Sequence, residues 1–355
     1  MDIRLQIEQR EKVMLSPWAI CAANSQGRER LEKPDPIRTA FMLDRDRIIH
    51  SKSFRRLKHK TQVFIAPPGD HYRTRLTHTL EVNQIGKTIA AGLNLNLDLI
   101  EAIALAHDVG HTPFAHSGEI ALNHLLPDGF QHNRNSIRVL TRIEQHKDKP
   151  GLNLTAEVLD GVLHHSGYGE NKPPAATLEG QTIRLSDKIA YVQHDIDDSI
   201  RAGLLSPQDL PTEYIKVLGT THSERIATLV SDAIYYTNTL MAAADNKPTV
   251  SLSPPIDQAL RGLRNFMFKN IYQGDICKAE RRRATFIIEK VFEFFMQNPQ
   301  KMSPLFLQIA EEEGLARAVG DYISGMTDDY CTSIFEAIYV PRSLLPDVTK
   351  IDFFL

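Results

Sequence analysis

Apolar residues recur at helical spacing along most of the chain. From Leu76 to about Leu93 they predict an amphipathic helix, whose apolar face holds Leu80, Val82, Ile85, Ile89 and Ala90. The stretch LDLIEAIALAHD (97–108) is almost continuously apolar, which is typical of a helix buried on most of its sides. The same spacing predicts further helices over residues 4–15, 117–126, 133–147, 155–164, 179–203, 223–244, 256–272, 279–297, 302–312 and 314–325.

Alternating patterns typical of β-strands are rare, and the run TQVFI (61–65) is the best candidate. The residues PPGD (67–70) that follow are typical of a turn. The pattern therefore predicts an all-α fold with at most a minor β-hairpin. The pair Pro254-Pro255 marks a possible domain boundary, although one composite helical domain fits the pattern about as well as two. We expect an N-terminal segment, a helical core and a C-terminal helical region over residues 1–35, 36–250 and 251–355.

Composition narrows the class of protein without fixing its function. Of 355 residues, 42% are hydrophobic and 24% are charged, which fits a globular protein and excludes overall disorder. The formal net charge of -3 means that any binding of nucleotide or nucleic acid needs a local basic surface. The three cysteines are far apart and lack CxxC spacing, which argues against a disulfide framework or a thiolate zinc site. With neither a signal-peptide core nor eighteen consecutive apolar residues, we expect a soluble cytoplasmic protein.

Four ionisable residues in tightly patterned helical segments are candidate ligands of a metal ion: His78, the pair His107-Asp108, and Asp187. An ionised aspartate at the end of a buried helix is costly unless a cation or hydrogen-bond donors satisfy it. Two imidazoles and two carboxylates suit Mn, Fe, Zn, Ni or Mg and leave positions for water and phosphate oxygens. We therefore expect one divalent metal ion of unspecified identity.

A single histidine on an apolar helix face is usually an ordinary core residue, and a single His-Asp pair is common by chance. The surroundings change this interpretation, because His107, Asp108, His111, His116 and Glu119 fall within thirteen residues around a loop bent by glycine and proline. Cores do not collect so many ionisable groups without a use for them. His116 and Glu119 are three residues apart, so on a helix they share a face and can hydrogen-bond. This spacing makes them a candidate acid/base pair.

The sequence also resembles a known family. The four candidate ligands match the H…HD…D signature of HD phosphohydrolases, and longer strings are similar to its dGTPase-like branch of deoxynucleoside triphosphate triphosphohydrolases. These strings are FRRLKHKTQVF (54–64), RTRLTHTLEV (73–82), AHDVGHTPFAH (106–116), SDKIAYVQHDIDD (186–198) and DYISGMTDDY (321–330). The resemblance covers roughly residues 35–340. It implies an all-helical fold, cleavage of a dNTP into deoxynucleoside and inorganic triphosphate, and a homo-oligomer such as a tetramer or hexamer.

The resemblance also implies roles for individual residues. His116 and Glu119 become the catalytic pair, and His111 and His132 assist at the phosphates, although from its sequence context alone His132 is equally well a surface loop residue. Arg75 and Lys188 contact phosphates, and both positions suit this, since Arg75 lies three residues before His78 and Lys188 follows Asp187. The remaining expected substrate contacts are Tyr191 on the sugar, Asp195 on its 3′-hydroxyl, and Gln62 near sugar or base.

Tyr191 and Asp195 lie four and eight residues after Asp187, so a helix places all three along one face, but Tyr191 is also compatible with ordinary core packing. Two positions depart from the family, which often has Gly at Ala115 and Gln at Asn135. Neither residue is a candidate ligand, so the departures put base preference in doubt rather than the chemistry. The pair His164-His165 is a further candidate site element without an assigned role.

Between residues 45 and 60 the chain carries seven cations: Arg45, Arg47, Lys52, Arg55, Arg56, Lys58 and Lys60. Such a run is usually a solvated face, and relatives use such surfaces for a regulatory nucleotide, single-stranded DNA or subunit contacts. Two other functions compete with the dNTP triphosphohydrolase. One is an HD phosphohydrolase with another substrate, either a 5′-nucleotidase or a cyclic-nucleotide phosphodiesterase. The other is a regulatory nucleotide- or DNA-binding protein without catalysis.

Overall fold

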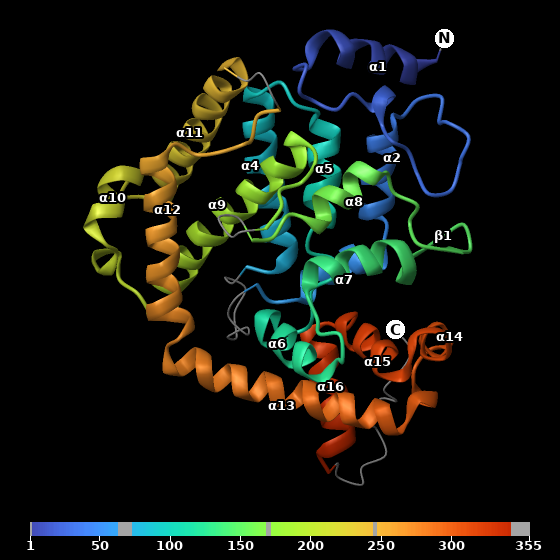
Figure 1. Ribbon diagram of the computed structural model, residues 1–355. Helices are drawn as coiled ribbons and strands as arrows, with labels where there is room; N and C mark the ends of the chain where they lie inside the picture. Colours follow the sequence, from blue (N-terminus) through green and yellow to red (C-terminus); the bar gives the residue numbers. More distant parts are fainter. Residues whose placement is uncertain (1, 63–72, 168–171, 244–246, 342–355) are drawn as a thin grey trace.

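The computed structural model describes residues 2–62, 73–167, 172–243 and 247–341, and their secondary structure is almost entirely helical (Figure 1). The helices of the first half are α1 (Ile3–Met14), α2 (Ala40–Ile49), α3 (Lys52–Arg56), α4 (Arg75–Gly92), α5 (Leu97–Ala106), α6 (Ala115–Leu125), α7 (His132–Arg138) and α8 (Ala156–Leu163). Those of the second half are α9 (Leu178–Arg201), α10 (Thr212–Leu218), α11 (His222–Ala243), α12 (Pro254–Met267), α13 (Asp275–Gln297), α14 (Pro304–Glu313), α15 (Leu315–Ser324) and α16 (Asp328–Tyr339).

Short turns and one small hairpin complete the described structure. The 3-10 turns are η1 (Ala22–Asn24), η2 (Leu57–His59), η4 (Pro207–Asp209) and η6 (Pro299–Lys301), and the π-helical turns are η3 (Val139–Ile143) and η5 (Phe268–Tyr272). The hairpin pairs β1 (Gln145–His146) with β2 (Lys149–Pro150) in antiparallel register. Among the described residues, no helix combines the length and apolarity that crossing a membrane needs.

The all-α prediction with at most a minor hairpin is confirmed, and each helix expected from apolar spacing has a counterpart. The helix expected over 133–147 is wrong at its end, because α7 gives way to the π-helical turn η3 and then to strand β1. Four helices without a clear apolar period were not expected, namely α2, α3, α10 and α16. In the candidate strand 61–65, Thr61 forms an isolated bridge to Thr74, and residues 63–65, like the turn at 67–70, lie outside the described residues.

The larger hydrophobic core surrounds α5, which packs against α2, α4, α8 and α9 (Figure 1). Most of its side chains from Leu99 to Ala106 are buried, as the almost continuous apolar run predicts. Helix α12, which lies far from α5 in the sequence, adds Leu260 and Leu263 to this core. The three helices α4, α5 and α9 all contact one another at the centre of this core.

A second hydrophobic cluster lies where α13, at one edge of the molecule (Figure 1), packs against α6, α15 and α16. Its aromatic centre is Tyr322, whose ring makes edge contacts with Phe295 and Phe306. Helix α6 contributes Ala121 and Leu122 to this cluster. Because α6 follows directly on the candidate metal-binding segment, the cluster fixes that segment from one side. The expected boundaries at residues 35 and 250 stay predictions.

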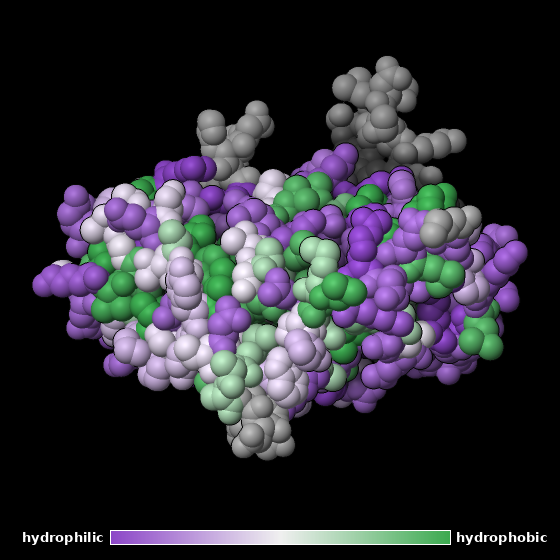
Figure 2. Space-filling model, turned by 90° about the horizontal axis from the view of Figure 1, so that it is seen from above, coloured by the Kyte–Doolittle hydropathy of each residue, from purple (hydrophilic) through white to green (hydrophobic). Residues whose placement is uncertain are grey.

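The surface has the mixed character of a globular protein. On the face seen in Figure 2, hydrophilic residues predominate and hydrophobic ones form smaller patches between them. Isolated apolar residues at a surface are ordinary and need no special explanation.

Candidate metal centre

The candidate ligands come from three helices that contact one another. Helix α4 begins at Arg75, where Thr74 and Thr77 form a capping box, and His78 lies in its first turn. Helix α5 ends at Ala106, so His107 is its C-cap residue and Asp108 follows in the loop. Asp187 lies in the middle of α9. The ends of two helices and the middle of a third thus meet at one point.

The side chains of these residues converge. His78 Nε2 lies 3.1 Å from Asp187 Oδ1, and His107 Nε2 lies 3.6 Å from Asp108 Oδ2 and 3.9 Å from Asp187 Oδ1. One ligand atom each from His78, His107 and Asp108 lies within 4.8 Å of the others. Helix packing therefore brings all four candidate ligands together, although more than a hundred residues separate His78 from Asp187.

The protonation pattern of the cluster fits a divalent cation. His107 Nδ1 donates to the carbonyl oxygen of Ala104 at 2.6 Å, so in the neutral imidazole Nε2 is the nitrogen that carries the lone pair. That Nε2 is buried without a hydrogen-bond partner. Burial raises the pKa of Asp108 and of Asp187, but the neighbouring histidines, with Arg75 at Asp108, outweigh it and lower both pKa values. Two ionised carboxylates and an orphaned imidazole nitrogen are the donors that such an ion needs.

A second group of ionisable residues lies beside the first. The rings of His111 and His132 stack with their centroids 4.1 Å apart, and the ring of His116 lies 5.8 Å from that of His111. Asp108, His111 and His132 form another set that could hold a metal ion. His132 begins α7 and is half-buried, so the alternative interpretation of a surface loop histidine is wrong.

The Glu119 carboxylate contacts two histidines rather than one. Its Oε2 lies 3.5 Å from His116 Nδ1, whereas both of its oxygens lie 3.0 Å from His132 Nδ1, and Oε1 accepts the backbone N–H of His132 at 2.9 Å. The expected pair of His116 and Glu119 is therefore present but looser than the pair of His132 and Glu119. Burial lowers the pKa of His132, but the hydrogen bond with Glu119 outweighs it and raises this pKa.

His165, to which the sequence assigned no role, belongs to the same group. Its ring lies 5.0 Å from that of His107, and its Nε2 lies 3.3 Å from His132 Nε2 and 3.8 Å from Asp108 Oδ1. Its Nδ1 donates to the carbonyl oxygen of Val162 at 2.6 Å, and burial lowers its pKa to about 4. His165 thus offers a lone pair on Nε2 to its neighbours.

The expected substrate contacts occupy different parts of this region. Arg75 is buried, and its Nη1 donates to Asp108 Oδ2 at 2.7 Å, while its Nη2 donates to the carbonyl oxygen of Gln62 at 3.4 Å. Lys188 is buried beside Asp187 on α9. The side-chain oxygen Oε1 of Gln62 is buried without a hydrogen-bond partner.

Tyr191 and Asp195 follow Asp187 along the same face of α9. The ring of Tyr191 lies 6.4 Å from that of His116. Burial and the charge of Asp198 raise the pKa of Asp195, while a hydrogen bond with Tyr191 opposes this rise. Tyr191 therefore contacts both His116 and Asp195, and it also packs against the larger hydrophobic core.

Two neighbours of the site were missed in the sequence. His194 lies on α9 seven residues after Asp187, its ring is 5.8 Å from that of His78, and its Nδ1 is 3.1 Å from Glu81 Oε2. The seven-residue spacing, two helical turns, was a usable signal for it. Tyr272, whose ring lies 6.1 Å from that of Tyr191, is the last residue of the helix expected over 256–272 and lies in the π-helical turn η5, but nothing in the sequence places it beside Tyr191.

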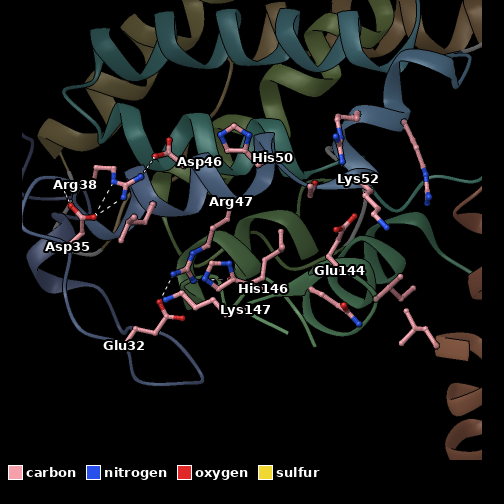
Figure 3. A pocket seen from close by; sticks show the side chains of 18 of the residues that line it. Glu32, Asp35, Arg38, Asp46, Arg47, His50, Lys52, Glu144, His146 and Lys147 are labelled. Carbon is pink, nitrogen blue, oxygen red and sulfur yellow. Dashed lines mark hydrogen bonds and ion pairs between the residues drawn. The ribbon is translucent and has the colours of Figure 1, made fainter. Parts of the chain in front are cut away.

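The cation-rich segment 45–60 is only partly a solvated face. Lys52, Arg55 and Lys58 are exposed, but Lys60 is buried and 2% exposed, so the interpretation as a solvated face is wrong for this residue. A cavity of about 940 Å³ lies beside α2 and α3, close to β1 and the start of α14 (Figure 3). None of the candidate metal or catalytic residues lines it.

Cations exceed carboxylates around this cavity, with seven lysine and arginine residues against four acidic ones. Some of the cations are neutralised locally, since Arg38 pairs with Asp35 and Asp46, and Arg47 pairs with Glu32 (Figure 3). Lys52 and Arg55 line the cavity from α3. The cavity is therefore a separate, positively charged concave surface.

Comparison with known proteins gives the family. Residues 75–192 match the HD domain model and residues 250–337 match the model described as phosphohydrolase-associated domain. Relatives described as deoxyguanosinetriphosphate triphosphohydrolase-like proteins are 57% identical in Clostridium tetani, over 97% of this chain and 98% of the relative, and 52% identical in Caldanaerobacter subterraneus, over 96% and 97%. A third, from Desulfatibacillum aliphaticivorans, is 42% identical over 97% of this chain and all of its own length. The chain therefore belongs to the HD-domain family of dGTPase-like phosphohydrolases.

Proposed function

We propose that the protein is a metal-dependent triphosphohydrolase that cleaves deoxynucleoside triphosphates into deoxynucleoside and inorganic triphosphate. The observation that carries this proposal is the convergence of His78, His107, Asp108 and Asp187 beside the stacked pair of His111 and His132. The name of the relatives, which specifies deoxyguanosine triphosphate, supports the substrate class.

The four converging residues would hold one divalent ion, which is manganese, magnesium, iron, nickel or zinc. When bound, such an ion polarises a phosphate group and neutralises charge that develops during hydrolysis. Arg75 is held next to this position by Asp108, yet its Nε is buried without a hydrogen-bond partner. A guanidinium with a donor to spare suits a phosphate oxygen, and Lys188, beside Asp187, would add a second cation.

The histidine group would handle protons and phosphate charge. His116 is the most open of these residues, with 55% of its side chain exposed, so it can reach a bound substrate. Glu119 fixes the orientation of both His116 and His132, as an acid/base group requires. His111 and His132 would then lie along the phosphates. His116 would either protonate the leaving 5′ oxygen or activate the attacking water.

The far end of the site would hold the deoxyribose. Tyr191 and Tyr272 form an aromatic wall with ring centroids 6.1 Å apart, and Asp195 lies behind Tyr191 on the same helix. We place Tyr191 against the sugar, where its ring would occupy the space of a 2′-hydroxyl. Asp195 would accept the 3′-hydroxyl, and Gln62 would lie near sugar or base.

The positively charged cavity is a candidate regulatory site, distinct from the catalytic one. A volume of about 940 Å³ is in the range of pockets that enclose a small ligand, which favours a nucleotide over single-stranded DNA. The exposed Lys52 and Arg55 would contact its phosphates. Isothermal titration of the variants Lys52→Glu and Arg55→Glu with each dNTP tests this assignment, and Lys58→Glu, which is exposed but does not line the cavity, is the control.

We further propose that the protein is a homo-oligomer, either a tetramer or a hexamer.

The function is tested by incubating the protein with each dNTP in the presence of manganese or magnesium and separating the products by ion-exchange chromatography. Release of intact inorganic triphosphate is the expected result. Monophosphate with pyrophosphate would instead show cleavage at another bond. Hydrolysis of nucleoside monophosphates or cyclic nucleotides alone would indicate one of the competing HD activities, and nucleotide binding without turnover would indicate a regulatory protein.

A further inference from the structure

The α5–α6 loop (residues 107–114) reaches His116 through a strained stretch of backbone. Phe114 has a φ of 59° and Ala115 has a φ of 53°, which is the left-handed region for two successive residues with a side chain at Cβ. This conformation costs roughly 1–2 kcal/mol per residue. Strain of this kind persists only where the surroundings hold the backbone in place. The contacts that hold this loop therefore also determine where His116 lies.

The first of these contacts comes from Lys60. This residue follows η2 and is 2% exposed. Its Nζ donates to the backbone carbonyl oxygen of His111, within the loop, and to that of Ser324 at 2.7 Å, at the end of α15. Burial lowers the pKa of the Lys60 ammonium to about 7, because a charged group is costly to remove from water. The buried Lys60 ammonium thus joins two stretches of main chain.

The second contact comes from Asp328, in the first turn of α16. Its Oδ1 accepts the backbone N–H of Phe114 at 2.9 Å. Its Oδ2 accepts the backbone N–H of Thr61 at 3.0 Å and the hydroxyl of Thr61 at 2.7 Å. The loop is therefore tied at His111 and at Phe114 to the same two stretches of chain, residues 60–61 and residues 324–328.

We propose that Lys60 is a positioning residue for the hydrolysis proposed above: together with Asp328 it fixes the α5–α6 loop and, through it, His111 and His116. Neither residue needs to touch the substrate. The strings around Lys60 and Asp328, FRRLKHKTQVF and DYISGMTDDY, then act at the active site through the main chain. The C-terminal helices α15 and α16 become part of the catalytic apparatus without contributing a catalytic residue.

The test compares the full-length variants Lys60→Met and Asp328→Asn with two matched controls, Lys58→Met and Asp329→Asn. Both control residues are exposed and lie one or two positions from their counterparts. Steady-state kinetics and hydrogen–deuterium exchange of peptides covering residues 110–118 are measured for each. We expect local exchange to rise about tenfold or more. We expect kcat to fall about 10- to 100-fold with KM changed less than about threefold, since displaced catalytic groups lose rate rather than binding. Lys60→Arg, which keeps a cationic donor, should recover part of the rate.

Several results would overturn the proposal. One is unchanged exchange over residues 110–118 in both variants, and another is a kcat equal to that of the controls. Exchange that rises throughout the protein, together with a rate loss shared by kcat and KM, would show a role in general stability instead. If the unmodified protein releases no triphosphate, the proposed function fails, and the exchange measurement still decides whether Lys60 and Asp328 hold the loop.

Discussion

Arg75 and Asp108 form a buried ion pair at the candidate metal centre, in which Arg75 Nη1 donates to Asp108 Oδ2 at 2.7 Å. The pair joins the start of α4 to the loop after α5. It also connects two proposed roles, because Asp108 is a candidate metal ligand and Arg75 a candidate phosphate ligand. A substrate phosphate bound by the metal would thus lie next to a guanidinium that is already oriented, at no further cost in side-chain entropy.

Replacing Arg75 by lysine should therefore impair catalysis although the charge is retained. Lysine has no planar fork of donors and cannot hold Asp108 and a phosphate oxygen at the same time. We expect kcat/KM for dGTP to fall about 100-fold, through a higher KM and a lower kcat. Steady-state kinetics measure the effect, and Lys87→Met on the exposed side of α4, where Lys87 pairs with Glu101, serves as the control. A kcat/KM close to that of the control would remove Arg75 from phosphate binding.

Asp187→Ala should abolish turnover and metal binding while leaving the helical fold intact. Asp187 faces both candidate histidine ligands, at 3.1 Å from His78 and 3.9 Å from His107, so its loss leaves the ion one anionic ligand fewer. In the unmodified protein, metal at a 100-fold excess over its Kd should stabilise the fold by about 2.7 kcal/mol. The variant should show no such rise in Tm with manganese. Asp197→Ala, on the same helix but paired with Arg73, should behave as the unmodified protein, and equal metal content in both variants would contradict the assignment.

Much of the site could be predicted because the spacing of residues within one helix determines which of them lie on the same face. Asp187, Tyr191 and Asp195 are four residues apart in a single helix of 24 residues, so their common face follows from the sequence alone. The relation of Arg75 to His78 depends only on where α4 begins, and it begins at Arg75. The all-helical fold follows in the same way from the apolar period of α4 and α9 and from the almost continuous apolar run of α5.

Other features could not be predicted, since they arise from packing between distant segments. Nothing in the local sequence places His165 against His132, which is 33 residues away. Lys60 stands in a run of cations whose other members include exposed residues, and only the contact with Ser324, at 264 residues' separation, reveals it as buried. Helices α2 and α3 were not predicted, because the charged residues of the same run interrupt their short buried faces.

Tyr191→Ala should weaken the distinction between deoxyribonucleotides and ribonucleotides. The ring of Tyr191 lies 6.4 Å from that of His116 and 6.1 Å from that of Tyr272, where it would exclude a 2′-hydroxyl. We expect the ratio of kcat/KM for dGTP to that for GTP to fall at least about tenfold. The reason is that discrimination against one small extra group in a pocket is worth roughly 1–3 kcal/mol. The same ratio is measured for Tyr235→Ala, a tyrosine on α11 that is 74% exposed. An unchanged ratio in Tyr191→Ala would mean that Tyr191 only packs the core.

The pair of Glu119 and His132 should make stability depend on pH in a defined window. Burial lowers the pKa of His132, but the hydrogen bond with Glu119 outweighs it, so the pKa lies above its usual 6.5. Burial likewise raises the pKa of Glu119, but hydrogen bonds with His116 and His132 outweigh it, so this pKa lies below its usual 4.5. On the alkaline side, the contribution of the Glu119–His132 pair to the free energy of unfolding is fully present below pH 6.5. It is lost as pH rises through the folded-state pKa of His132. On the acid side, it is present above pH 4.5 and is lost as pH falls through the lowered pKa of Glu119.

Glu119→Gln removes the charge that produces both shifts. The Tm of this variant should therefore lie furthest below that of the unmodified protein between about pH 4.5 and 6.5. The difference should shrink at alkaline pH, because His132 is then neutral in the folded and in the unfolded protein. Thermal unfolding followed by circular dichroism at about pH 5.5, 7 and 9 measures the difference. Glu280→Gln, whose exposed partner is Arg283 on α13, provides the control. A deficit that is equal at all three pH values would show that Glu119 stabilises the fold without holding a proton on His132, and the orientation of His132 would then need another cause.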